Sequence, residues 1–170
     1  MCLSSFTSYV TNPVICSSKF HYKLGIIMNS NCDGKDVGDS IFVIASQINY
    51  GEEYTLKNRE LRTKVAKLNM RAGKRALDGY NHETAYSFLK TSSSLLHEDH
   101  WESCYELSLR INFLTARAAY CCRHFDTAES MLQRIFEKAL STKDKLSAYS
   151  LLGTSEFLLL CYICIWYSHI

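Results

Sequence analysis

Proline occurs once in the chain, at Pro13, and apolar residues recur at helical spacing over most of the sequence that follows. A proline within a helix removes a backbone hydrogen bond and clashes with the preceding turn, so long helices are free to form after Pro13. Seven glycines are also few for the many tight turns of a β-sandwich or barrel. The sequence therefore predicts an all-α fold.

Composition describes a chain that can bury a core. Of 170 residues, 47% are hydrophobic and 21% are charged, which excludes a disordered protein. The formal net charge of +2 gives no overall attraction to nucleic acid or to an anionic membrane. Eight cysteines are scattered and mostly flanked by apolar residues, which favours buried, reduced thiols in a cytoplasmic protein over a disulfide framework.

The N-terminal part carries weaker signals. Residues 1–19 show no sustained period and are interpreted as an ill-defined leader, which is not a secretory signal because its first sixteen residues lack Lys and Arg. Residues 20–53 are expected to form a helical lead-in with a polar loop. In it, Phe20–Met28 fits either a helix or a strand, and Asn29–Gly38 is typical of a loop.

The second half of this lead-in predicts a helix. Asp39 or Ser40 is expected to cap it, and Gly51 to end it. The β-branched run at 41–44 leaves a strand open as the alternative. The apolar positions at helical spacing are Ile41, Ile44, Ala45 and Ile48.

Residues 54–152 are predicted to be a helical-hairpin repeat domain. A long helix is expected over Lys57–Leu77, Gly79 ends it, and Asn81 caps a second helix that folds back against the first. The stripe of the first helix is Leu61, Val65, Leu68, Ala72 and Ala76. The stripe of the second is Ala85, Phe88, Leu89, Ser92, Leu95 and Leu96.

A second hairpin follows the polar turn His97–His100. Its first helix, Trp101–Cys122, is apolar on two sides, as expected of a helix between neighbours. Asp126 and Glu129 resemble a capping box for its second helix, and Thr142 is expected to cap the start of a truncated third hairpin. The stripe of the second helix is Ala128, Met131, Leu132, Ile135, Phe136, Ala139 and Leu140.

The two hairpins indicate a degenerate repeat. Ala85 and Ala128 are 43 residues apart, against about 34 in a tetratricopeptide repeat. Phe125 stands three residues before Ala128 while Tyr80 stands five before Ala85, which predicts a turn two residues longer in the first hairpin. The residues expected to pack the stack are Ala72, Ala85, Leu89, Trp101, Ala116, Phe125, Ala128 and Leu132.

Residues 153–170 form an apolar C-terminal tail. Its uncharged run Phe157–Tyr167 is eleven residues long, whereas a membrane-spanning helix needs about 20. The sequence therefore predicts a core helix there and no membrane anchor.

Five segments together resemble a known family: Ile41–Gly51, Val65–Ala76, Trp101–Leu107, Ala119–Ala128 and Thr142–Tyr149. They are similar to the helical-repeat region that follows the AAA-type ATPase module of large multidomain sensor kinases, both hybrid histidine kinases and serine/threonine kinase relatives. The resemblance covers about residues 20–152 and implies a linker that binds protein modules. The leader matches nothing in that family, and the tail replaces the expected third hairpin, as in a truncated gene product.

The catalytic motifs of that family are missing from the sequence. Residues 32–40 lack the first glycine of a phosphate-binding loop and the hydroxyl that should follow Lys35. No H-R-D, D-F-G or glycine-rich kinase loop occurs. We therefore expect neither catalysis nor a cofactor from this chain.

One side of the helix at 57–75 gathers basic residues. This side is a candidate surface for an acidic protein partner or for nucleic-acid phosphates. No aromatic residue is interleaved for base stacking, which argues against nucleic acid. The favoured interpretation is a solvated face near the acids Glu98, Asp99 and Glu102. The basic residues of the cluster are Lys64, Lys67, Arg71, Lys74 and Arg75.

Three further patterns lack the spacing that their chemistry requires. The histidines at the two ends of His97–His100 are not one helical turn apart, so no metal site is predicted. Cys161 and Cys164 have no second pair of ligands and lie among apolar residues, which predicts buried thiols. Cys121 and Cys122 with His124 lack an orienting acid, so a catalytic nucleophile is not expected.

These patterns favour a non-catalytic, all-helical scaffold that binds other proteins. One alternative is a fragment of an ATP-dependent sensor kinase whose ATPase and kinase modules lie elsewhere. The second alternative is an acidic-surface or nucleic-acid binder that uses the basic helix.

Overall fold

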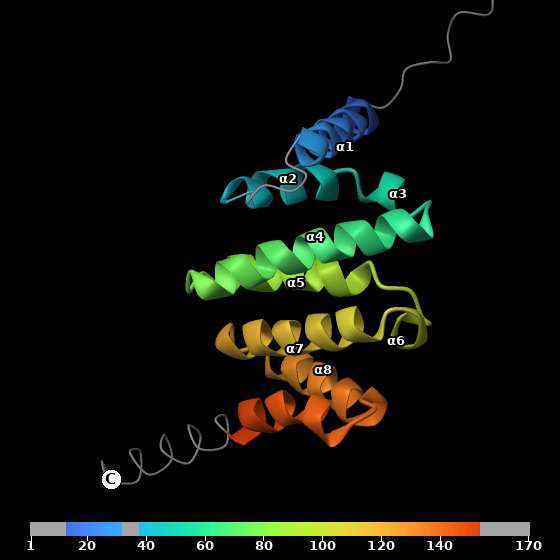
Figure 1. The fold of residues 1–170 in the computed structure, drawn as a ribbon. Coiled ribbons are helices and arrows are strands. Elements are labelled where there is room, and N and C mark those ends of the chain that lie inside the picture. Colours follow the sequence, from blue (N-terminus) through green and yellow to red (C-terminus); the bar gives the residue numbers. More distant parts are fainter. Residues whose placement is uncertain (1–12, 32–37, 154–170) are drawn as a thin grey trace, which may run out of the picture.

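The computed structural model describes residues 13–31 and 38–153, and throughout these ranges the regular structure is helical. Helices are stacked one below another, with α1 at one end and residues 142–153 at the other (Figure 1). The prediction of an all-α chain is confirmed for this part. The helices are α1 (Pro13–Asn31), α2 (Ser40–Asn49), α3 (Glu52–Thr55), α4 (Arg59–Asp78), α5 (His82–Ser94), α6 (His100–Ser103), α7 (Tyr105–Cys121), α8 (Phe125–Lys138) and the helical residues 142–153.

Helix α1 begins earlier and ends later than the sequence indicated. Pro13 is its first residue, where the missing N–H is not needed and the fixed φ suits a helix. Part of the expected leader is therefore helical, Phe20–Met28 is helix and not strand, and residues 29–31, which were expected in the loop, belong to the helix. Residues 1–12 and 32–37 lie outside the described residues.

Helix α2 is held by partners that the sequence did not indicate. Asp39 is its N-cap residue but makes no capping hydrogen bond. Its carboxylate instead accepts a hydrogen bond from Nε of Arg75 at 2.9 Å.

After α2 the chain turns at Gly51. A Cβ added there would lie 2.5 Å from Cβ of Tyr22, so only glycine fits against α1.

The turns after α4 and α7 are built alike. Each passes through one residue with positive φ, Tyr80 at 58° and Arg123 at 62°, and each is closed by two backbone bonds. Asn81 N–H donates to the carbonyl of Ala76 at 2.9 Å, as His124 does to Ala119 at 2.8 Å, which is the Schellman pattern. The matching backbone bonds are Tyr80 to Leu77 and Arg123 to Tyr120.

This geometry corrects two predictions about the second hairpin. His124 is the N-cap of α8, so Asp126 lies inside the first turn and forms no capping box. Tyr80 corresponds to Arg123 and not to Phe125, so the turn of the first hairpin is not longer. The cap predicted at Asn81 is confirmed, because Asn81 Oδ1 accepts from Thr84 N at 3.2 Å.

The predicted helix Trp101–Cys122 is interrupted. At Cys104 the backbone leaves the helical region, with φ −143° and ψ 50°, and Trp101 lies in the separate short helix α6. The buried hydroxyl of Ser108 explains the break, because its Oγ lies 2.8 Å from the carbonyl oxygen of His100 and 2.7 Å from His100 Nδ1. Ser108 thus holds α6 against the start of α7.

The last described helix starts one residue earlier than predicted. Ser141, not Thr142, provides the cap, since its Oγ accepts a hydrogen bond from Asp144 N at 3.2 Å. The helix is described to residue 153. Whether a third hairpin forms lies outside the described residues, as do the apolar run Phe157–Tyr167 and the cysteines Cys161 and Cys164.

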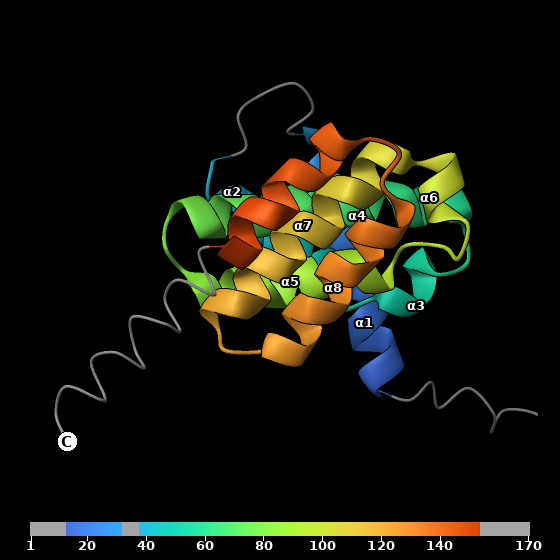
Figure 2. The ribbon, with the colours of Figure 1, turned by 90° about the horizontal axis from the view of Figure 1, so that it is seen from below.

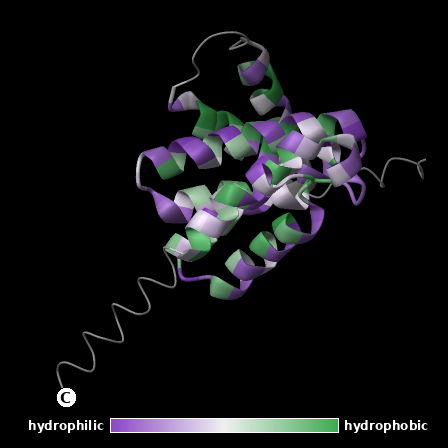
Figure 3. Cartoon of the chain, turned by 60° about the horizontal axis from the view of Figure 1, so that its bottom comes forward, coloured by the Kyte–Doolittle hydropathy of each residue, from purple (hydrophilic) through white to green (hydrophobic). Residues whose placement is uncertain are grey.

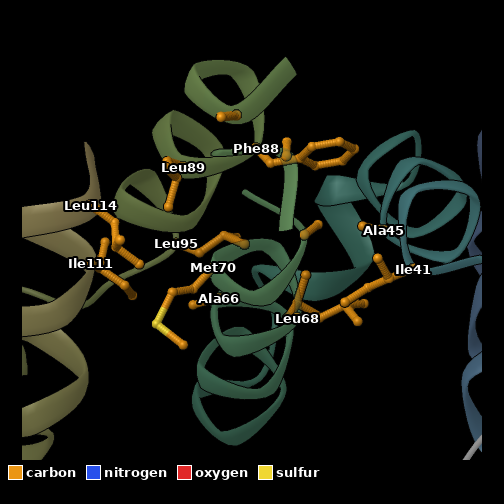
Figure 4. Close-up of a cluster of buried hydrophobic side chains, with 14 of the residues drawn as sticks. Ile41, Ala45, Ala66, Leu68, Met70, Phe88, Leu89, Leu95, Ile111 and Leu114 are labelled. Atoms are coloured by element: carbon orange, nitrogen blue, oxygen red, sulfur yellow. The ribbon is translucent and has the colours of Figure 1, made fainter. Parts of the chain in front are cut away.

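The core runs through the stack as two clusters, formed mainly by the predicted stripes. In Figure 3 hydrophobic and hydrophilic residues alternate along the helices. Ile111 and Leu114 from α7 point toward Met70 and Leu95 in the larger cluster (Figure 4). The smaller cluster joins α7, α8 and the last helix through Ala116, Leu132, Ile135 and Ala148.

Candidate functional site

An open groove lies where α4, α7, α8 and residues 142–153 meet. Figure 2 shows the helices from below, so that α7 and α8 lie nearer to the viewer than α4. The volume of the groove is about 510 Å³, which is within the size range of ligand-binding clefts. The lining residues are Lys67, Met70, Arg71, Glu106, Leu107, Leu109, Arg110, Phe113, Ile135, Lys143, Asp144 and Ser147.

The floor of the groove is apolar and its rim is basic. Ile135 is fully buried and Met70 nearly so, while Leu107, Leu109 and Phe113 are half-buried. Lys67, Arg71, Arg110 and Lys143 supply four positive charges, against the acids Glu106 and Asp144. An apolar floor with a charged rim combines hydrophobic contact with electrostatic selection of what binds.

The basic cluster predicted on α4 is divided by the structure. Lys64 pairs with Glu60 at 2.7 Å, and Lys74 pairs with Asp78 at 2.6 Å. Arg75 reaches across to Asp39. These exposed pairs contribute little to stability, but they engage three cations of the cluster with acids of the same chain.

Lys67 and Arg71 differ from the rest of that cluster. Both are exposed on α4 and line the groove. Neither forms an ion pair with any residue that the structure describes. They are the members of the cluster whose charges are available to a partner.

The acids expected near the cluster form no ion pair with it among the described residues. Asp99 forms an ion pair with Arg59, at the start of α4 and outside the cluster. The hydrogen bond from Arg59 holds the pKa of the Asp99 carboxyl below its usual value. No ion pair of Glu98 or Glu102 is found within residues 13–31 and 38–153. Lys67 and Arg71 are exposed, as a solvated face requires, and in the part of the chain that the structure describes neither is paired with these acids.

One acid in the groove wall is already engaged. The hydroxyl of Tyr105 donates to Asp144 Oδ2 at 2.7 Å and accepts from Leu140 N–H at 2.9 Å. This bond, with a smaller contribution from Ser141, lowers the pKa of the Asp144 carboxyl. Tyr105 therefore anchors the turn between α8 and the last helix. It is also hydrogen-bonded to Asp144, one of the two carboxylates in the groove lining.

The polar residues at 97–100 make structural contacts. His100 bonds to Ser108, and burial, with nearby Arg134, lowers the pKa of its imidazole. His97 Nε2 is buried without a hydrogen-bond partner in the described chain. Across the described ranges, no group of three or more His, Cys, Asp or Glu side chains is placed to hold a metal ion.

The Cys121–Cys122 pair is not arranged as an activated nucleophile. Burial, followed by the neighbouring Glu83 carboxylate, raises the pKa of Cys122 to about 11, so its thiol stays protonated at neutral pH. His124 instead stacks on Tyr86, with ring centroids 4.5 Å apart. Cys121 is exposed, contrary to the expectation that the cysteines are buried.

The residues expected to pack the stack occupy different environments. Trp101 is half-buried against the smaller core cluster. Phe125 is 54% exposed and contacts Tyr120 edge to face at 5.6 Å. The fully or almost fully buried members are Ala72, Ala85, Leu89, Ala116, Ala128 and Leu132.

No family model, curated protein or solved structure matches the chain. The similarity to the helical region of sensor kinases is thus supported only by the sequence segments that carry it. Among the described helices, none is both long and apolar enough to cross a membrane.

Sequence reasoning missed Arg110 and Lys143, which complete the rim from other helices. A signal for Arg110 was present in the sequence, because it stands 43 residues after Lys67. That spacing is the one found between Ala85 and Ala128. Applying it to the charged positions, and not only to the alanines, would have placed both cations on equivalent sides of α4 and α7.

Proposed function

We propose that this chain is a non-catalytic helical scaffold that binds a segment of another protein in the groove between α4, α7 and the last helix. The observation that supports this function best is the groove itself, with its apolar floor and its unpaired cations Lys67 and Arg71. Helix faces that line a groove are a common way to hold a peptide segment.

The finer fold that we propose is a stack of helical hairpins of the tetratricopeptide-like kind. Several features recur at 43 residues: the positive-φ residues Tyr80 and Arg123, their closing backbone bonds, and the buried Ala85 and Ala128. The repeat exceeds the roughly 34 residues of a tetratricopeptide repeat. The short helix α6 and its flanking turns, between α5 and α7, account for the extra length.

The wider setting is a proposal that rests on sequence resemblance. In it, the chain is the linker region of a signal-transduction kinase-like protein and holds modules that it does not itself contain. The alternative is a fragment of an ATP-dependent sensor kinase. Binding of nucleotide by the chain alone would favour that alternative.

Peptide selection tests the groove directly. A library of random peptides is selected on the full chain, and the bound peptides are then tested against protein whose groove is blocked. Blocking uses a bulky maleimide on Ser147→Cys in a Cys121→Ser background. Ser130→Cys, which is exposed on α8, carries the same label as the control.

We expect the label at position 147 to abolish peptide binding and the label at 130 to leave it unchanged. Hydrogen exchange should show protection of α4 and α7 when peptide is bound. Peptides that bind both labelled proteins equally, or a selection that yields no binder, would rule the groove out as the binding site.

A further inference from the structure

We infer that the groove selects an acidic segment with interspersed apolar side chains. This inference rests on the proposed function and names the chemistry of its partner. It depends on which cations recur along the stack, which of them are unpaired, and what lies beneath them.

The cations of the rim recur with the repeat. Lys67 on α4 and Arg110 on α7 are 43 residues apart, and so are Lys74 and Arg117. Lys74 and Arg117 lie two helical turns further along their helices, but neither lines the groove and Lys74 is paired with Asp78. The recurring pair of the rim is therefore Lys67 and Arg110. Two neighbouring helices thus present positive charge at matching positions, which is the arrangement that an acidic chain lying across them would meet.

The positive charge of the groove is not cancelled from within. Lys67, Arg71 and Arg110 form no ion pair with the described residues. The two acids of the lining, Glu106 and Asp144, are outnumbered by its four cations, so the net charge of the groove is positive. These unpaired cations attract carboxylates, and because all three are exposed the attraction is weakened by salt.

The apolar floor of the groove determines that the partner also needs apolar side chains. Met70, Leu107, Leu109 and Phe113 form a mainly aliphatic surface beneath the cations. Burial of the apolar side chains of a bound segment against this floor contributes favourable binding free energy. The acidic side chains between them reach the basic rim. A segment with acids alone would leave the floor exposed to water.

Nucleic acid fits this floor poorly. Single-stranded nucleic acid is held by bases stacked on aromatic rings, whereas Phe113 is the one aromatic residue in the groove lining and is half-buried. The observations therefore favour a protein segment.

The test measures binding of the full chain to a fluorescent synthetic peptide in which glutamates alternate with leucines. Twin peptides carry glutamine or lysine in place of glutamate, and a labelled oligouridylate is the nucleic-acid probe. The variant Lys67→Glu/Arg110→Glu reverses the rim. Lys19→Glu/Lys90→Glu is the matched control, since it makes the same charge change at exposed positions on α1 and α5.

We expect the glutamate peptide to bind at low salt, with affinity that falls as salt rises. The rim variant should lower that affinity roughly a hundredfold, and the control variant should leave it near that of the unmodified chain. Circular dichroism of both variants verifies that they are folded. A rim variant that has lost its helical signal is replaced by Lys67→Gln/Arg110→Gln, for which a smaller loss in the same direction is expected.

Other outcomes separate the inference from the function on which it rests. If the glutamine twin binds the groove as tightly as the glutamate peptide, the acidic preference is wrong while the groove remains a peptide site. If oligouridylate binds more tightly and responds to the rim variant, the partner is nucleic acid. If no peptide responds to the block at position 147, both proposals fail.

Discussion

Asn69 and Asn112 occupy matching positions of α4 and α7, and each donates from its side-chain amide to the backbone carbonyl four residues earlier. Asn69 Nδ2 bonds to Val65 O at 3.0 Å, and Asn112 Nδ2 bonds to Ser108 O at 2.8 Å. Both side chains are buried. They differ in their amide oxygens. Asn69 Oδ1 accepts from Asn49 Nδ2 at 2.8 Å, whereas Asn112 Oδ1 has no partner in the described chain.

This difference predicts that the same substitution costs more unfolding free energy at Asn69 than at Asn112. Asn69→Leu removes a reciprocal amide pair and leaves Asn49 without its partner, which should cost about 1–3 kcal/mol of unfolding free energy. Asn112→Leu removes an amide oxygen that is buried without a partner and should cost clearly less. Urea unfolding of both variants measures this. Equal losses would show that Asn112 Oδ1 accepts a hydrogen bond that stabilises the fold as much as the one from Asn49 to Asn69.

A close contact between α4 and α5 predicts an effect against helix propensity. Alanine favours a helix over glycine by about 1 kcal/mol, yet a Cβ on Gly73 would lie 2.4 Å from Leu89 Cγ. Gly73→Ala should therefore lower stability by about 1–3 kcal/mol. At Gly79 the nearest atoms would be 3.6 Å away, so Gly79→Ala should change the unfolding free energy little. A stabilised Gly73→Ala would contradict the packing described.

The left-handed residues of the two turns carry backbone strain that glycine would relieve. Tyr80 has φ 58° and is 84% exposed, so its ring contributes little packing. Tyr80→Gly should raise the unfolding free energy by about 0.5–1 kcal/mol. Tyr80→Ala is the matched control, since it removes the ring but keeps the strain. If alanine stabilises as much as glycine, the gain comes from the ring and not from the backbone.

The helices could be predicted because their signal is local. Each stripe repeats within a single helix, as with Ala85, Leu89 and Ser92, and burial follows directly from that period. The end of α4 at Gly79 and the cap at Asn81 were predicted correctly. The relative length of the two turns was misjudged because their left-handed residues are Tyr80 and Arg123, not the glycine that usually marks such a turn. The break at Cys104 was missed since it depends on Ser108 and His100, whose contact exists only in the folded chain.

The groove could be predicted only in part for the same reason. The cluster on α4 was visible in the sequence, but nothing local distinguishes Lys67 from Lys64. The distinction arises because Glu60 lies one turn before Lys64 and pairs with it, while Lys67 faces α7 and the last helix across the groove. Arg110 and Lys143 come from distant parts of the chain, so their contribution required the fold.

The contact between His100 and Ser108 predicts how stability responds to acid. Burial, with Arg134 and Lys138 nearby, lowers the pKa of the His100 imidazole in the folded chain below its ordinary 6.5, and Asp99 opposes this only in part. The unfolded chain therefore binds a proton at His100 more readily than the folded chain. The contribution of the His100 imidazole to the free energy of unfolding is fully present above about pH 6.5. It is lost as the pH falls below that value.

Thermal unfolding at pH 7.5 and at pH 5.5 measures this effect. The His100→Asn variant keeps a side-chain N–H for Ser108 but has no group that titrates in this range, so its melting temperature should fall less between the two pH values than that of the unmodified chain. A drop for His100→Asn as large as that of the unmodified chain would show that the acid sensitivity arises at groups other than the imidazole between α6 and α7.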